Sequence, residues 1–286
     1  MPRNSVDDAG PGGNDPATTA RERVPDEAHA ALRAVEAVLG RAPVAAYVSG
    51  SAVAGGLRPL SDVDVLVVVD DAPDADARRR LAAALMWVSG RYGAGGPTRP
   101  LDVTLVRYAD VVPWRYPPTR AFAYGEWLRA AYEAGAGSAP GPHPDLTIVL
   151  AHARAIGVPL CGRAARDVLE PVPEADLRRA LRDALPVLLA DLWGDERNVL
   201  LTLARMWHTA ATGAFVPKDA AAAWVAARLP ACMTVWLELA GRAYAGEAED
   251  DWRGHPAEVE ALADRLRREV ERACGSMGDE GPARGV

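Results

Sequence analysis

The pattern of apolar and polar positions changes character at about residue 171. Before it, short apolar runs of strand length alternate with longer stretches in which apolar residues recur at helical spacing, as in residues 25–39, which stop before Gly40. This alternation predicts a sheet flanked by helices. The segments predicted in this half are, in order, residues 25–39 (helix), 45–49 and 63–69 (strands), 74–88 (helix), 100–106 (strand), and 128–134 and 145–155 (helices).

After Pro171-Val172-Pro173 the strand signals end, and the apolar residues recur with a period near three and a half. This pattern predicts a helical domain. Its expected helices are residues 174–185, 195–212, 219–229, 233–244 and 257–274. We therefore predict an α+β protein, divided into an arm (1–24), a sheet-containing domain (25–171), an all-α domain (172–274) and a tail (275–286).

Candidate chemistry gathers around the second predicted strand. Asp62 and Asp64 stand at its start, and because side chains alternate along a strand, both point to the same side. Two carboxylates so close are costly unless a hard cation lies between them, and Mg²⁺ is held by one or two carboxylates plus substrate phosphates. Upstream, Gly50-Ser51 predicts a turn where the backbone and a hydroxyl can approach a phosphate.

An isolated Asp-x-Asp is most often a solvated turn or strand edge, so the pair alone does not identify a metal site. Asp102 strengthens the case. It lies in a segment in which Leu101, Val103 and Leu105 alternate with polar positions, as in a half-buried strand. If this strand pairs beside the preceding one, three acids share one rim of the sheet, and a phosphate-and-metal site is predicted there.

The composition of the 286-residue chain, 49% hydrophobic and 25% charged, is that of a folded soluble protein. Residues 1–24 lack the apolar core of a signal peptide, and no apolar run approaches the length of a membrane span. Cys161, Cys232 and Cys274 show no metal or redox spacing, which indicates free, buried thiols in a reducing cytoplasm. No membrane partner is expected.

The formal net charge of −7 argues mildly against a nucleic-acid partner, because phosphates would be repelled where no basic groove is evident. A cationic small molecule would be attracted. We expect a monomer that acts on small molecules.

These motifs resemble the nucleotidyltransferase superfamily of the DNA polymerase β type, in which a Gly-Ser turn and three acidic residues bind two Mg²⁺ ions and a nucleoside triphosphate. A narrower resemblance runs from about residue 43 to residue 244. Over this span the chain is similar to the bacterial streptomycin/spectinomycin (aminoglycoside 3''/9) adenylyltransferases. The motifs that carry it are Pro113-Trp114-Arg115-Tyr116-Pro117, Gly125-Glu126-Trp127, Asp145-Leu146-Thr147-Ile148, Gly194-Asp195-Glu196-Arg197-Asn198, Ala211-Thr212-Gly213 and Pro217-Lys218-Asp219.

The resemblance implies an N-terminal nucleotidyltransferase domain with a mixed sheet, and ATP- and Mg²⁺-dependent transfer of AMP to a hydroxyl of spectinomycin or streptomycin. Asp62 and Asp64 match the metal-binding pair. Asp102 stands where the family typically has a glutamate as general base, and where the wider superfamily often has an aspartate that binds metal, so both roles are assigned to it. An aspartate is one methylene shorter, and a displacement of about 1 Å can cost a large factor in rate.

The remaining matches divide between the nucleotide and the drug. Ser51 and Ser61 match phosphate contacts, together with the backbone at Gly50. The residues that match nucleotide contacts from the helical domain are Arg205, Lys218 and Tyr244, and those that match the drug site are Trp127, Asp191, Asp195 and Asn198.

One position departs from the family. Streptomycin-modifying members have a tryptophan nine residues before the Gly-Asp-Glu-Arg aspartate, and this chain has Pro186 there. Either Trp193 substitutes for it or streptomycin is a poor substrate, whereas spectinomycin, which is smaller and lacks guanidines, tolerates the loss better.

Structural interpretations stand beside these assignments. Trp127, Trp193 and Trp207 are of a type found more often in cores than in ligand sites, and helical spacing favours the core for Trp207. Arg205 could pair with a neighbouring acid, and Asp195 and Lys218 could simply begin helices. The alternative functions are transfer to another aminoglycoside or to a protein, and a non-catalytic regulator or antitoxin of the same fold.

Overall fold

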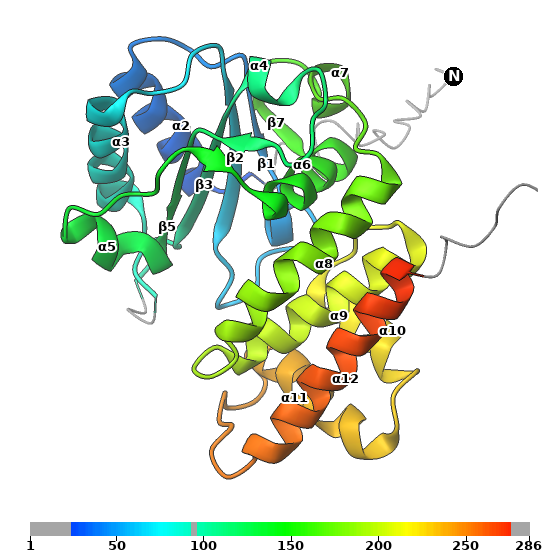
Figure 1. Ribbon diagram of the computed structural model, residues 1–286. Helices are drawn as coiled ribbons and strands as arrows, with labels where there is room; N and C mark the ends of the chain where they lie inside the picture. The colour runs from blue at the N-terminus through cyan, green and yellow to red at the C-terminus, as the bar shows by residue number, and fades with distance from the viewer. Residues whose placement is uncertain (1–23, 93–95, 276–286) are drawn as a thin grey trace, which may run out of the picture.

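The computed structural model describes residues 24–92 and 96–275. Its N-terminal half contains a sheet and its C-terminal half is helical (Figure 1). The α+β fold predicted from the sequence is confirmed. Except for residues 24 and 275, the predicted arm (1–24) and tail (275–286) lie outside the described residues.

A five-stranded mixed sheet forms the centre of the N-terminal half. The strand order is β5-β3-β2-β1-β7, and of its pairs β2 and β3 are parallel while the others are antiparallel. The sheet strands are β1 (Ala45–Val48), β2 (Val63–Val69), β3 (Leu101–Arg107), β5 (Phe122–Gly125) and β7 (Val158–Cys161). A separate two-stranded ribbon pairs β4 (Thr119–Arg120) with β6 (Gly141–Pro142).

Helices cover both faces of this sheet because its central strands are apolar on both sides. The odd-numbered residues of β2 pack with α2 (Asp26–Leu39) and α3 (Ala75–Val88). Leu66 and Val68 pack on the other face, beneath α6 (Pro144–Ile156) (Figure 1). The short helices of this half are α4 (Tyr108–Val111), α5 (Arg129–Glu133) and α7 (Ala165–Val168).

The sequence pattern missed β5, which ends in Gly125, and β7, which contains Pro159; glycine and proline are both depleted in strands. The helix predicted at 128–134 is present as α5 (Arg129–Glu133), and a 3₁₀ turn, η2 (Glu126–Leu128), directly precedes it.

The C-terminal half packs around one central helix, α9 (Glu196–Thr212), ten of whose residues are buried. Trp207 is 7% exposed within that core, which confirms its structural interpretation. The surrounding helices are α8 (Glu174–Ala190), α10 (Lys218–Ala226), α11 (Ala231–Ala245) and α12 (Pro256–Gly275).

Helix α8 corrects one predicted boundary. The pattern ended this helix at residue 185, before Pro186, but the helix continues to Ala190. A proline inside a helix removes one backbone hydrogen bond and strains the preceding turn. Leu188 and Leu189, beyond the proline, pack against the core of the helical half, and this burial offsets the loss.

The burial of the cysteines and the absence of membrane spans were also predicted from the sequence. The three cysteines are free, but only Cys274 is buried, whereas Cys161 is half-buried and Cys232 is exposed, so the prediction of buried thiols was wrong for two of them. Within the described part of the chain, no helix has the length and apolarity needed to cross a membrane.

Candidate active site

A cleft with a volume of about 1230 Å³ is lined by residues from both halves of the molecule. All thirteen residues singled out in the sequence lie on its walls. They are Gly50, Ser51, Ser61, Asp62, Asp64, Asp102 and Trp127 from the N-terminal half, and Asp191, Asp195, Asn198, Arg205, Lys218 and Tyr244 from the helical half.

The floor of the cleft is a row of four positions that crosses the sheet. Asp64 of β2 is the register partner of Asp102 on β3, and Asp102 in turn lies opposite Gly125 on β5. On the other side, the backbone N–H of Ser49 donates to the carbonyl oxygen of Asp64 over 3.0 Å, just before Gly50. Because directly paired residues face the same side of a sheet, the two carboxylates project together into the cleft.

Gly50 makes room for the carboxylate of Asp64. Its φ angle is +64°, which an L side chain rarely adopts, and a Cβ at this position would overlap Asp64 Oδ2. Two separate structural requirements therefore favour glycine at position 50. It permits the left-handed backbone of the 3₁₀ turn η1 (Gly50–Ala52), and it allows the acid to lie directly against that turn.

The acids at the floor repel one another. Burial and the neighbouring charge of Asp62 raise the pKa of Asp64 to about 7. Burial, then Asp64 and Asp62, raise the pKa of Asp102 well above its usual value, and the positive charge of Arg120 opposes this shift. A bound cation would relieve the repulsion among these acids.

The residues present fit Mg²⁺ in their donor chemistry, because carboxylate oxygens and substrate phosphates are its usual ligands. Within residues 24–92 and 96–275, however, no group of three or more His, Cys, Asp or Glu side chains is arranged so as to hold a metal ion. The ligand set of Asp62, Asp64 and Asp102 therefore stays a prediction. Two carboxylates completed by phosphate oxygens would need no such ready-made group.

Two cations approach the acids from the helical half. Arg205 of α9 and Lys218 of α10 are both deeply enclosed, and burial lowers the pKa of each. Lys218 Nζ donates to Asn198 Oδ1 over 2.5 Å and lies 5.3 Å from the ring centre of Tyr244. The positive charges of Arg205 and Lys218 act on Asp64 across the cleft, where a phosphate chain could lie between them.

Polar contacts tie the two walls together near this point. The hydroxyls of Ser61 and Tyr244 are 3.1 Å apart, and Ser61 Oγ also accepts from the backbone N–H of Arg58 over 3.0 Å. The Arg58 guanidinium pairs with Asp219 of α10. The residues assigned to the nucleotide are therefore joined across the cleft.

Acids and aromatic rings form a further group of lining residues, which begins at Asn198, the partner of Lys218. Asn198 Nδ2 donates to Asp195 Oδ2 over 2.9 Å, and burial raises the pKa of Asp195. Trp127 and Trp193 are each 56% exposed and both line the cleft, so the alternative of a place in the core does not hold for these two. Pro186 is exposed on α8 and does not line the cleft.

Several lining residues were not identified from the sequence. Tyr92 donates its hydroxyl to Asp62 Oδ2 over 3.4 Å, and burial raises its pKa. His152, 7% exposed, lines the cleft from α6, and burial with the charge of Arg205 lowers its pKa to about 4, so it is neutral near pH 7. Neither residue belongs to a sequence motif that indicates a binding site, so only the three-dimensional structure identifies them as lining residues.

Comparison with known proteins gives a consistent result. A family model described as the C-terminal domain of aminoglycoside adenylyltransferase matches residues 167–269, and a nucleotidyltransferase domain model matches residues 32–91. A spectinomycin 9-adenylyltransferase of Staphylococcus aureus is 45% identical over 87% of this chain and 96% of its own length. An aminoglycoside (3'') (9) adenylyltransferase of Escherichia coli is 40% identical over 81% of this chain and 89% of its own.

A solved structure agrees with these relatives. The crystal structure of the spectinomycin adenyltransferase AAD(9) from Enterococcus faecialis, with ATP and spectinomycin, superposes with a TM-score of 0.82 at 30% sequence identity. The match covers 86% of this chain and 98% of that one.

Proposed function

The chain belongs to the aminoglycoside adenylyltransferase family, and from that premise we propose that it transfers AMP from ATP to a hydroxyl of spectinomycin. One observation carries the proposal. The residues assigned to nucleotide and drug line one cleft, and Asp64 and Asp102 lie side by side on neighbouring strands at its floor.

For the nucleotide, the β- and γ-phosphates of ATP would lie against the turn at Gly50 and Ser51. Arg205 and Lys218 would neutralise their charge from the helical half, and Tyr244 would contact the nucleotide beside Lys218. These cations are already desolvated, so little solvent reorganisation is needed when charge moves along the phosphate chain during reaction.

At the floor, Asp62 and Asp64 would hold Mg²⁺, which supplies Lewis-acid stabilisation of the phosphoryl oxygens when bound. Asp102 would accept the proton of the drug hydroxyl as that oxygen attacks the α-phosphorus, and pyrophosphate would leave.

For the drug, Asp191 and Asp195 would pair with amino groups of the antibiotic, and Asn198 would hold Asp195 in position through the hydrogen bond already present. The indole of Trp127 would contact the ring system. These acids agree with a cationic substrate, since carboxylates at the mouth of a cleft raise the local concentration of cations.

The test is to incubate the purified protein with ATP, Mg²⁺ and spectinomycin and to weigh the antibiotic by mass spectrometry. We expect an adduct heavier by one AMP, with release of pyrophosphate. Asp64→Asn should abolish the adduct while the protein stays folded by circular dichroism. If wild-type protein forms no adduct with either spectinomycin or streptomycin, the proposal is wrong.

Streptomycin is the second candidate, favoured by the presence of Trp193 on the cleft wall together with Asp191. We rank streptomycin second on the family resemblance alone, because members that modify streptomycin have a tryptophan where this chain has Pro186, which does not line the cleft. Another aminoglycoside or a protein can be added to the same assay in place of spectinomycin. If that molecule is the true acceptor, pyrophosphate is released with it and not with spectinomycin.

A further inference from the structure

Gly125 leaves a space at the end of β5 that the indole of Trp127 fills. A Cβ on Gly125 would lie well inside 3.0 Å of Cε3, Cζ3 and Cη2 of the indole, a distance that real Cβ atoms essentially never show. The backbone of Gly125 is extended, with φ at −144°, so any residue could adopt it. The glycine is therefore required by the position of the Trp127 ring and not by the backbone.

The ring takes the place of a side chain at a defined point of the sheet. Gly125 is directly opposite Asp102 in the antiparallel pair of β3 and β5. Opposite residues in such a pair face the same side, with Cβ atoms roughly 4.5–5.5 Å apart. The indole of Trp127 consequently lies on the same face as the Asp102 carboxylate, about one interstrand spacing away from it.

The backbone that carries Trp127 is held in place by its neighbour, Glu126, which is 8% exposed. The Glu126 carboxylate accepts hydrogen bonds from Ser89 Oγ over 3.3 Å, from the Tyr124 hydroxyl over 3.1 Å and from Arg129 Nε over 2.6 Å. Ser89 in turn is bound to β3, because its Oγ accepts from the Leu101 backbone N–H over 3.1 Å. This network fixes the turn η2 against the sheet.

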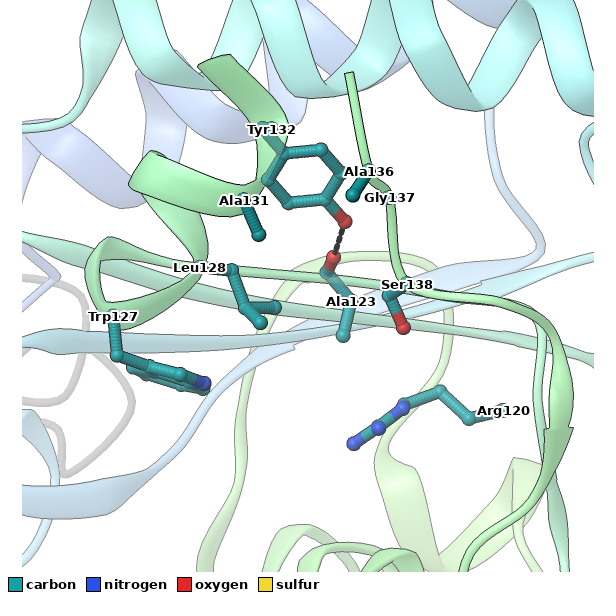
Figure 2. A pocket seen from close by; sticks show the side chains of 9 residues that line it. All are labelled: Arg120, Ala123, Trp127, Leu128, Ala131, Tyr132, Ala136, Gly137 and Ser138. Atoms are coloured by element: carbon teal, nitrogen blue, oxygen red, sulfur yellow. Dashed lines mark hydrogen bonds between the residues drawn. The ribbon is translucent and has the colours of Figure 1, made fainter. Parts of the chain in front are cut away.

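The indole itself is not fixed by a packed core. It lines the large cleft and also a second cavity of about 210 Å³, shared with Arg120, Tyr132 and Ser138. In Figure 2 the indole of Trp127 and the guanidinium of Arg120 extend toward each other across this cavity. A displaced ring would therefore have room to move without disrupting the fold.

We propose that Gly125 is a positioning residue of the substrate site. By lacking a Cβ it lets the Trp127 indole lie flat beside Asp102, where the ring forms one wall for a saturated, cationic aminocyclitol. An aromatic face suits such a ligand because it offers both apolar contact and attraction to a nearby cation. The substrate named in this inference rests on the proposed function. The position of the Trp127 ring against Gly125 does not depend on that function.

The effect of Gly125 on the position of the Trp127 ring can be measured without an activity assay. The protein has eight tryptophans. In a ¹H–¹⁵N spectrum, the indole Nε1–H signal that disappears in Trp127→Ala belongs to Trp127. Gly125→Ala should shift that signal. Gly141→Ala on β6, where a Cβ would meet nothing within 4 Å, is the matched control and should leave it in place. An unmoved Trp127 signal in Gly125→Ala would overturn the inference.

A double-mutant cycle tests the consequence for the substrate. Gly125→Ala should lower kcat/KM for spectinomycin by about 10- to 100-fold, as expected for a misplaced contact, and leave KM for ATP unchanged. In the Trp127→Ala background the same change should cause no further loss. If the two losses multiply, Gly125 does not act through Trp127. Failure of the wild-type protein to transfer AMP would instead count against the proposed function, while the spectrum still decides on the position of the Trp127 ring.

Discussion

Replacing Gly50 with alanine perturbs the reaction site through one methyl group. The added Cβ would overlap the Asp64 carboxylate, and real Cβ atoms essentially never come within 3.0 Å of another heavy atom. Asp64 must therefore rotate or move by about 1 Å or more. A misplacement of this size in a reacting group can cost ~10²-fold in rate.

The same substitution also strains the backbone. Alanine at a φ of +64° costs about 1–2 kcal/mol relative to glycine, independent of any contact. Gly40→Ala isolates this cost, because Gly40 ends α2 at a φ of +69° and a Cβ there would meet nothing within 4 Å. We expect both variants to lose similar stability and Gly50→Ala alone to lose activity.

The assay is AMP transfer to spectinomycin at saturating ATP and Mg²⁺, with thermal unfolding measured on the same samples. The expected result is a fall of ~10²-fold in kcat for Gly50→Ala and wild-type kcat for Gly40→Ala. If Gly50→Ala keeps wild-type kcat, or if Gly40→Ala loses as much, the contact between Gly50 and Asp64 does not have the role given to it here.

Three further predictions concern single charges in the cleft. Because burial and Asp62 raise the folded-state pKa of Asp64 to about 7, from 3.8 for an exposed carboxyl, the folded protein keeps a proton there that the unfolded chain has lost. The free energy of unfolding without metal should therefore fall as pH rises from about 4 to about 7 in urea titrations with EDTA, and Asp64→Asn should reduce the slope; an unchanged slope contradicts this pKa. Lys218→Met should raise the Kd for ATP by roughly 10- to 100-fold in calorimetry, as for loss of a charged hydrogen bond, and an unaltered Kd would remove the residue from the nucleotide site. Asp195→Asn should raise KM for spectinomycin but not for ATP. An equal rise in both KM values would contradict a specific role of Asp195 in binding the drug.

The sequence was sufficient for the central part of the site. The alternation of Asp62, Val63 and Asp64 correctly predicted which side chains face the cleft, because the two-residue period of a strand leaves no freedom once Val63 is buried. The pairing of β2 with β3, which was only a condition of the prediction from sequence, then aligned Asp64 with Asp102.

What the sequence could not predict depends on contacts between distant segments. Tyr92 and Asp62 are brought together by the fold, and the pairing of Arg58 with Asp219 spans both halves of the chain. The role of Gly125 is also absent from the pattern, because it becomes visible only when the ring of Trp127 occupies the place of the missing Cβ. Strand β5 was missed for a different reason, since it ends in Gly125, a residue type that is depleted in strands.

The most direct test of the account is a structure of the ternary complex with Mg²⁺, a non-hydrolysable ATP analogue and spectinomycin. We predict that the α-phosphate lies beside Asp62 and Asp64, and that the reacting hydroxyl of the drug lies within hydrogen-bond reach of Asp102, about 2.6–3.2 Å, against the indole of Trp127. A drug bound with every hydroxyl beyond the reach of Asp102, or a triphosphate bound away from Asp64, would contradict it.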